Sequence, residues 1–244
     1  MCPYKMLFVA ARLDDPALAG RWERGLASDE RERARRFIDP AHGRRLVLRR
    51  WVLRCMLGAR LGAAPEALRF CVNAFGRPTL APPFDRAGLF FSTSHSGDLA
   101  LIALRIGTPA FAIDIEQVRP LDDMEQIVAR FFSPREQQEF FALDPTDRPD
   151  AFWRGWTVKE AFVKALGLGL SFPLDHFDVT LGPNRPAAIE RIQAGDADRW
   201  GVRVIEFGAS FRAALVGQDL QDLAPVITPV RIDATALPDP LRSV

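Results

Sequence analysis

Two acidic residues separated by one position stand inside an apolar run, Asp114-Ile115-Glu116. If this run is a strand, both carboxylates point to one face, roughly 6.5–7 Å apart along the backbone, and Ile115 faces the core. Carboxylates at this spacing can converge on one hard cation such as Mg²⁺, and a third acid would strengthen the site. An exposed acidic strand end has the same pattern, so the spacing alone leaves both interpretations open.

A glutamate and a lysine stand four residues apart, Glu160 and Lys164, in a stretch free of proline and glycine that predicts a helix. The simplest interpretation is an exposed ion pair worth about 0.3–0.5 kcal/mol. The chain holds 32 Lys+Arg, however, and lysine occurs only at Lys5, Lys159 and Lys164. Because an ammonium is compact and can lose its proton, two lysines around one glutamate favour a functional role. Glu160 is then the candidate third metal ligand.

A third candidate is the turn Ser94-His95-Ser96, which separates two apolar runs in the outline of a hairpin. Its hydroxyls could donate hydrogen bonds to a phosphate, and His95 could carry charge near neutral pH. A purely structural turn histidine is the alternative. A hydrolase triad is disfavoured, because the glycine elbow of a nucleophilic serine is missing.

Composition excludes several classes of protein. The net charge of +1 excludes a polycation, although residues 21–60 hold twelve arginines against five acids. No basic run is interleaved with aromatic residues, which disfavours nucleic-acid binding. The cysteines, Cys2, Cys55 and Cys71, have no metal-binding spacing and suggest a reducing compartment. No span approaches ~20 apolar residues. We therefore expect a soluble cytoplasmic protein that binds neither nucleic acid nor membrane.

The elements that position these residues alternate between strands and helices, which predicts an α+β fold. Apolar runs and caps predict strands at residues 6–11, 89–94, 99–104, 111–118, 177–181, 200–207 and 211–216, and helices that begin near Ser28, Gly43 and Ser133 and around Trp156.

The chain also resembles itself at a shift of 105 residues. Ser28 then meets Ser133, Asp39-Pro40 meets Asp144-Pro145, Trp51 meets Trp156, and Leu61-Gly62 meets Leu166-Gly167. This repeat predicts two similar α/β halves in a pseudo-two-fold arrangement, residues 1–107 and 108–218, followed by an appended tail, 219–244. Since one chain holds both halves, we expect a monomer.

The repeat places the three acids opposite apolar residues. Asp114, Glu116 and Glu160 correspond to Val9, Ala11 and Cys55, and Lys164 corresponds to Ala59. The chemistry is therefore expected in one copy only, at the junction of two unequal halves.

Taken together, the motifs resemble a known family. They are Ser94-His95-Ser96-Gly97, Asp114-Ile115-Glu116, Phe131-Phe132-Ser133-x-x-Glu136, and the segment from Trp156 through Lys159-Glu160 and Lys164 to Gly169-Leu170. In order and spacing they resemble the 4'-phosphopantetheinyl transferases of the large pseudo-dimeric type that activate surfactin synthetase and related carrier proteins. The resemblance extends from about Ser28 to Val216.

The resemblance implies a role for each matching residue. Asp114, Glu116 and Glu160 are similar to the Mg²⁺ ligands of the family, and Ser94 and His95 to contacts with the phosphates of coenzyme A. The basic residues that the resemblance places near coenzyme A are Arg33, with Arg45 adjoining it, Arg77, Lys164 and, with a less certain role, Lys159. Glu30 stands where the family often has a second basic contact to the 3'-phosphate.

The implied activity is that of a holo-[acyl-carrier-protein] synthase type of enzyme. It would transfer the phosphopantetheine arm of coenzyme A to a serine of an acyl or peptidyl carrier protein, with Mg²⁺, Lys164 and Asp114 at the reacting phosphate. Glu160 is expected to act as general base, directly or through a metal-bound water. Two alternatives remain open: a catalytically silent module that binds coenzyme A or a carrier protein, and a Mg²⁺-dependent phosphohydrolase.

Overall fold

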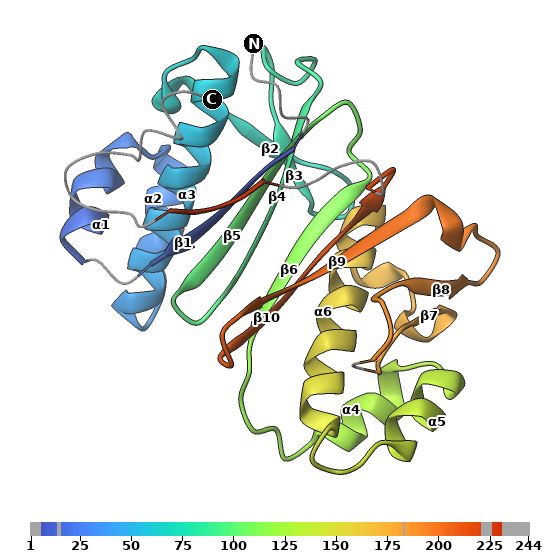
Figure 1. Ribbon diagram of the computed structural model, residues 1–244. Coiled ribbons are helices and arrows are strands. Elements are labelled where there is room, and N and C mark those ends of the chain that lie inside the picture. Colours follow the sequence, from blue (N-terminus) through green and yellow to red (C-terminus); the bar gives the residue numbers. More distant parts are fainter. Residues whose placement is uncertain (1–5, 14–15, 183, 221–225, 231–244) are drawn as a thin grey trace.

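The computed structural model of the chain describes residues 6–13, 16–182, 184–220 and 226–230. Two β-sheets occupy the middle of the molecule, and each is covered on its outer face by helices from its own half of the chain (Figure 1). The α+β class predicted from the sequence is confirmed.

The first half supplies three α-helices and three of the four strands of one sheet. The strand order is β11-β1-β5-β4, in which β1 and β5 as well as β5 and β4 run antiparallel. Its elements are β1 (Met6–Arg12), α1 (Pro16–Trp22), α2 (Ser28–Arg35), α3 (Pro40–Leu61), the short hairpin of β2 (Phe70–Val72) and β3 (Pro78–Leu80), β4 (Leu89–Ser96) and β5 (Leu99–Ile106).

The second half repeats this order of elements. Its sheet runs β6-β10-β9, which matches β1-β5-β4 strand for strand. Its elements are β6 (Phe111–Gln117), α4 (Met124–Phe131), α5 (Pro134–Ala142), α6 (Arg148–Leu166), the short hairpin of β7 (Phe177–Val179) and β8 (Ile189–Ile192), β9 (Trp200–Phe207) and β10 (Phe211–Gln218).

Alternation along the central strands sorts their side chains into separate cores. In β5, Ala100, Ile102 and Leu104 pack beneath the helices of the first half. The intervening Leu99, Leu101 and Ala103 instead join a third core between the two sheets. The second half contributes to this shared core with Phe111, Ile113 and Ile115 of β6 and Phe211, Ala213 and Leu215 of β10. The two halves therefore bury apolar side chains against each other.

The tail differs from the expectation of an appendage. Residues 226–230 form β11, which pairs in parallel with β1, from Leu7 opposite Val226 to Ala11 opposite Val230. Val-Ile-Thr-Pro-Val is short and contains a proline, which is tolerated in an edge strand but hides the strand pattern. The remaining tail residues, 221–225 and 231–244, lie outside the described residues.

Local sequence signals explain most of the helix boundaries. At α5, Ser133 and Glu136 form a capping box, in which Ser133 Oγ accepts from the Glu136 amide (3.2 Å) and Glu136 Oε2 from the Ser133 amide (2.7 Å). At α2 the N-cap is Ala27, one residue before the predicted serine, and the Ala27 amide donates to Glu30. Within the described ranges, no helix has the length and apolarity needed to cross a membrane.

Candidate active site

Strand β6 carries the two acids of the Asp-x-Glu motif. Ile113 and Ile115 are fully buried in the shared core, so Asp114 and Glu116 point to the opposite face, toward α6. Asp114 is only 1% exposed, whereas Glu116 is half-buried. The prediction that this motif is a strand with both carboxylates on one face is confirmed.

Three serines of β4 connect the first sheet to β6, and we refer to Ser92, Ser94 and Ser96 as the serine ladder. Ser94 Oγ donates to Asp114 Oδ1 (2.8 Å) and Ser96 Oγ donates to Glu116 Oε2 (2.9 Å). Ser92 Oγ accepts from the Ile113 amide (3.1 Å), and Ser96 Oγ accepts from the Gln117 amide (3.0 Å). Alternate residues of a strand share a face, so all three hydroxyls reach the same neighbour. The first half thus orients both acids of the second.

Helix α6 places Lys164 directly at these acids. Lys164 Nζ lies 2.5 Å from Asp114 Oδ1, and the lysine side chain remains 39% exposed. Glu160 precedes Lys164 by one helical turn and is half-buried. Because α6 packs against β6 and β10, its inward-facing turn is held over the acidic strand.

The electrostatics of the cluster reflect burial and crowding of like charges. Burial raises the pKa of Glu116, and the negative charge of Asp114 raises it further. Burial also raises the pKa of Glu160, although Lys164 opposes this effect. For Lys164, desolvation acts to lower the pKa, but the ion pair and hydrogen bond with Asp114 raise it above its ordinary value. Lys164 is therefore a firmly charged ammonium.

A cavity of about 450 Å³ opens beside this cluster. Its lining includes Asp114, Glu116 and Lys164 as well as three arginines, Arg33 of α2 and Arg49 and Arg50 of α3, and we call it the arginine-walled cavity. Guanidinium groups bind phosphates in a bidentate manner. A cavity whose lining combines three arginines with a lysine suits a ligand with several phosphates.

The acids also fit a hard divalent cation by donor type. Asp114 Oδ2 is buried and has no hydrogen-bond partner among the described residues, and the charge of Glu160 lies close enough to Glu116 to raise its pKa. Oxygen donors of this kind suit Mg²⁺. Within the part of the chain that the structure describes, however, no three such side chains are arranged to hold a metal ion. Asp114 Oδ1 is instead held by Lys164 and Ser94.

The structure gives Lys159 a different place from the one that the resemblance implied. Its side chain is 0% exposed and pairs with Glu136 (2.7 Å), and its ammonium donates to the carbonyl oxygens of Leu174 (2.7 Å) and Phe177 (3.0 Å). The ammonium also lies 4.2 Å from the centroid of the Phe177 ring. Lys159 is therefore a core residue of the second half and does not line the cavity.

The first half contains the counterpart of this buried pair. Arg54, which lies 105 positions before Lys159, is 1% exposed and pairs with Glu30 (2.8 Å). It also donates to the carbonyl oxygens of Pro65 (2.8 Å) and Leu68 (2.9 Å). In each half, a buried ion pair therefore connects the first turn of a short helix to a long helix. The helices are α2 and α3 in the first half and α5 and α6 in the second. Glu30, which departs from the family pattern, is explained by this role.

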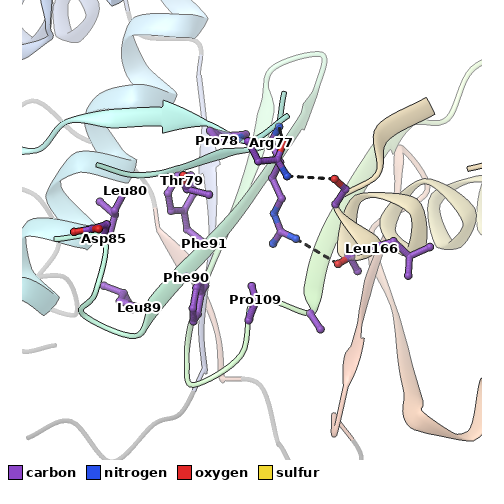
Figure 2. A pocket seen from close by; sticks show the side chains of 14 residues that line it. Arg77, Pro78, Thr79, Leu80, Asp85, Leu89, Phe90, Phe91, Pro109 and Leu166 are labelled. Atoms are coloured by element: carbon purple, nitrogen blue, oxygen red, sulfur yellow. Dashed lines mark hydrogen bonds between the residues drawn. The ribbon is translucent and has the colours of Figure 1, made fainter. Parts of the chain in front are cut away.

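Arg77, which the resemblance places near coenzyme A, lies at the contact between the two halves. It does not line the arginine-walled cavity but lies between two smaller pockets, of about 310 Å³ and 250 Å³. Figure 2 shows the first of these pockets, in which the Arg77 guanidinium donates a hydrogen bond to the carbonyl oxygen of Ala165 at the end of α6. The Arg77 guanidinium donates to three backbone carbonyl groups of the second half.

His95 lines the cavity, but its protonation differs from the prediction. Desolvation, followed by the charges of Arg49 and Lys164, lowers the pKa of His95 to about 4. The imidazole is therefore neutral near pH 7, because the arginines that suit a phosphate also repel a proton. The charge of Arg45 contributes to the same effect, although Arg45 is not among the cavity-lining residues.

Two contributors escaped sequence reasoning, and a third was expected at a phosphate but has another role. Arg49 and Arg50 belong to a helix with many arginines, and the pattern alone does not tell which of them face a cavity. Ser96 holds Glu116, and the alternation Ser92-x-Ser94-x-Ser96 was the available signal.

Comparisons with known proteins agree with this geometry. The sequence model of the 4'-phosphopantetheinyl transferase superfamily matches residues 110–216. The chain is similar to the 4'-phosphopantetheinyl transferase HetI of Nostoc sp. strain PCC 7120, with 40% identity over 69% of this chain and 70% of the relative. It is also similar to a 4'-phosphopantetheinyl transferase of Bacillus subtilis, with 33% identity over 73% of this chain and 78% of the relative.

A third relative gives the same result. The 4'-phosphopantetheinyl transferase Sfp of Bacillus subtilis strain 168 is 31% identical over 68% of this chain and 70% of its own length. These alignments cover most of both chains, and the family model covers the strand and helix that carry Asp114, Glu116, Glu160 and Lys164. The chain belongs to the 4'-phosphopantetheinyl transferase superfamily.

Proposed function

We propose that this protein transfers the 4'-phosphopantetheine arm of coenzyme A to a serine of an apo acyl or peptidyl carrier protein, with 3',5'-ADP as the leaving group. The observation that carries the proposal is the position of Lys164, which contacts Asp114 and at the same time lines the arginine-walled cavity. A pyrophosphate at this point would meet a fixed ammonium, while Arg33, Arg49 and Arg50 are available for a second phosphate group.

The roles of the residues follow from their positions. Lys164 neutralises negative charge on the phosphate under attack and on the departing 3',5'-ADP. Glu160 accepts the proton of the carrier serine, directly or through a water molecule, as that oxygen bonds to the β-phosphorus and the bond to the leaving phosphate breaks.

Mg²⁺ is the metal that we propose, with Asp114, Glu116 and Glu160 as its ligands. The buried and unpartnered Asp114 Oδ2 supports this assignment. When bound, the ion would supply Lewis-acid stabilisation of the pyrophosphate charge. Hydrogen bonds from Ser94 and Ser96 of the serine ladder orient the carboxylates of Asp114 and Glu116 for this role.

We also propose that residues 1–107 and 108–218 are two copies of one α/β unit, related by a pseudo-two-fold axis and acting as a monomer. The matched element order and the matched buried pairs of Arg54 and Lys159 support this proposal. The exposed free thiol of Cys71 suits a reducing compartment, for which we propose the cytoplasm.

The test is to incubate the protein with coenzyme A, Mg²⁺ and a panel of apo carrier proteins, and to weigh the products by mass spectrometry. We expect one carrier to gain the mass of a phosphopantetheine group. Transfer should stop with EDTA and return with excess Mg²⁺. It should fall on the order of 10²- to 10⁴-fold in Glu160→Gln, which removes the base.

The matched control is Glu206→Gln, which changes an exposed acid of β9 that does not line the cavity and should leave transfer unchanged. Binding of coenzyme A without a mass gain on any carrier would contradict the proposal and favour a silent binding module. Release of phosphopantetheine to water without a carrier would favour a phosphohydrolase.

A further inference from the structure

The loop between β2 and β3, residues 73–77, joins the first half of the chain to the end of α6, and we call it the latch loop. Arg77 Nη1 donates to the carbonyl oxygens of Lys164 (3.2 Å) and Ala165 (3.3 Å). Arg77 Nη2 donates to the carbonyl oxygen of Phe111 (2.9 Å). A single side chain of the first half therefore holds both α6 and β6 of the second.

The two segments that Arg77 holds are those that carry the reacting groups. Its contact at Phe111 lies at the start of β6, three residues before Asp114. Its contact at Lys164 is the backbone of the residue whose ammonium pairs with Asp114. Arg77 therefore contacts both α6, which carries Lys164, and β6, which carries Asp114, and these two residues also contact each other.

The end of a helix is a suitable place for a guanidinium. The last carbonyl groups of a helix lack partners within the helix and carry partial negative charge. At the end of α6, Gly167 has a φ of +70°, so the chain turns away through the left-handed region. The carbonyl oxygen of Lys164 accepts from the Gly167 amide (3.1 Å), and it and the carbonyl oxygen of Ala165 also accept from the planar fork of Arg77.

Asn73 stabilises the latch loop from within and adds a further bridge. Its Oδ1 accepts from the amides of Phe75 and Arg77 (both 2.9 Å), which sets the path of the loop. Its Nδ2 donates to the carbonyl oxygen of Gly167 (3.3 Å). The loop is therefore shaped so that Arg77 approaches α6 in a fixed direction.

We propose that Arg77 is a positioning residue of the transfer reaction, which sets the end of α6, and with it Lys164, relative to Asp114 and the arginine-walled cavity. This inference rests on the proposed transferase function. It differs from a direct contact with coenzyme A, because the hydrogen bonds that the Arg77 guanidinium makes among the described residues go to backbone carbonyl groups of the second half.

The two roles respond differently to a lysine at position 77. A phosphate contact needs one positive charge, which lysine retains. The latch needs a planar group that reaches three carbonyl oxygens in two segments, and an ammonium on a flexible stem does not reproduce this geometry. Arg77→Lys therefore separates the two roles, and Arg77→Gln shows the effect of removing the charge as well.

The matched control is Arg148, at the opposite end of α6. Its guanidinium also donates to backbone carbonyl groups, those of Leu143 (3.3 Å) and Phe141 (3.1 Å), and it pairs with Glu125 (2.8 Å). All these partners belong to the second half and do not line the cavity. Arg148→Gln thus removes comparable hydrogen bonds without affecting the latch.

The experiment measures kcat and the KM for coenzyme A in the transfer assay, together with hydrogen exchange of the amides in the last turn of α6. Arg77→Lys and Arg77→Gln should lower kcat by roughly 10- to 100-fold, because small misplacements of catalytic groups have effects of this size. We expect KM to change less than about threefold and the α6 amides to exchange faster. Arg148→Gln should leave kcat unchanged.

Other outcomes overturn the inference. A rise in KM that exceeds the fall in kcat, or a Lys variant with unchanged kcat, would make Arg77 a ligand contact or a bystander. If Arg148→Gln lowers kcat as much as the Arg77 variants do, the loss of kcat reflects a general loss of stability and not the position of Lys164. If the wild-type protein transfers nothing to any carrier, the proposed function fails. The exchange measurement still decides whether Arg77 holds the end of α6.

Discussion

His95 lines the arginine-walled cavity, and its surroundings lower the pKa of its imidazole. Desolvation and the charges of Arg49 and Lys164 hold its pKa at about 4, against an ordinary value of 6.5. A phosphate bound in the cavity would offset these positive charges and stabilise the imidazolium. The binding of an anion is thus expected to be linked to the uptake of a proton.

This linkage can be measured by calorimetry. Coenzyme A binding should take up protons between about pH 4, the pKa of His95 in the free protein, and pH 6.5, its ordinary value, and affinity should rise as pH falls through this window. The expected observation is a binding enthalpy that depends on the ionisation enthalpy of the buffer. His95→Gln should reduce this dependence to the part that comes from proton exchange by the phosphate itself, which remains in both proteins. Identical buffer dependence in the two proteins would contradict the prediction.

The same shift has a defined sign for stability. The unfolded chain, in which His95 has its ordinary pKa of 6.5, takes up the proton before the folded protein does. The contribution of His95 to the free energy of unfolding therefore decreases as pH falls from about 6.5 toward 4.

At the residue scale, the sequence located the reacting groups better than the binding groups. Asp114 and Glu116 were identifiable from alternation and from their apolar counterparts in the repeat, and the structure brings them to Lys164. Lys159 resembled a ligand contact, because a motif does not report burial. Its counterpart Arg54 was visible in the same repeat and would have indicated a core role.

At the scale of elements, the buried pair of Lys159 and Glu136 is expected to contribute to stability and not to binding. Both side chains are almost completely buried, at 0% and 1% exposure. Loss of one partner of such a pair leaves an uncompensated charge, which costs about 3–5 kcal/mol. Glu136 retains the amides of Ser133 and Val179 as donors, so we expect a value near the lower limit.

The measurement is urea unfolding of Lys159→Met, with the affinity for coenzyme A determined on the folded variant. The free energy of unfolding should decrease by about 3 kcal/mol, and the affinity should stay within about threefold of the wild type. Lys164→Met is the comparison, since it should weaken binding instead. If a folded Lys159→Met protein binds coenzyme A tenfold more weakly, the prediction is wrong and Lys159 contributes to coenzyme A binding.

The predictability of the elements follows their length and periodicity. The long helices α3 and α6 and the strands β4, β5, β6, β9 and β10 have clear apolar patterns and were predicted. The three- and four-residue strands β2, β3 and β8 are too short for alternation to be recognised, and β2 and β3 were assigned to a loop-rich region. The helices α1 and α4, with seven and eight residues, are likewise too short for their helical periodicity to be recognised, and they were not predicted.

At the scale of the whole molecule, the shared core makes the two halves interdependent. The inner faces of both sheets are buried only against each other, and the serine ladder connects their edges. The sequence repeat predicted two similar units, but it held no sign of this contact surface. Apolar residues that face a second sheet look the same in sequence as those that face a helix.

A truncation tests the contribution of β11 to this assembly. A chain that ends at residue 225 lacks the strand that pairs with β1, so its backbone hydrogen-bonding groups are exposed along one edge. We expect the unfolding midpoint to fall by a few degrees and self-association to increase. The transfer rate per folded molecule should remain, since β11 does not line the cavity.

A chain that ends at residue 230 is the control, because it keeps β11 and separates the loss of this strand from the loss of residues 231–244. An unchanged midpoint in the shorter chain, measured by scanning calorimetry, would show that the pairing of β11 with β1 contributes nothing to stability.

The pairing of the first strand with the last has a consequence for biosynthesis. During translation, β1 and its neighbours β5 and β4 leave the ribosome well before residues 226–230 are made. The outer edge of β1 therefore stays open while the entire second half is being synthesised, and an open edge strand is a site of mispairing. In this protein, chaperone demand should be greatest for nascent chains that are nearly complete, and any factor that slows translation after residue 218 should lower the yield of native enzyme.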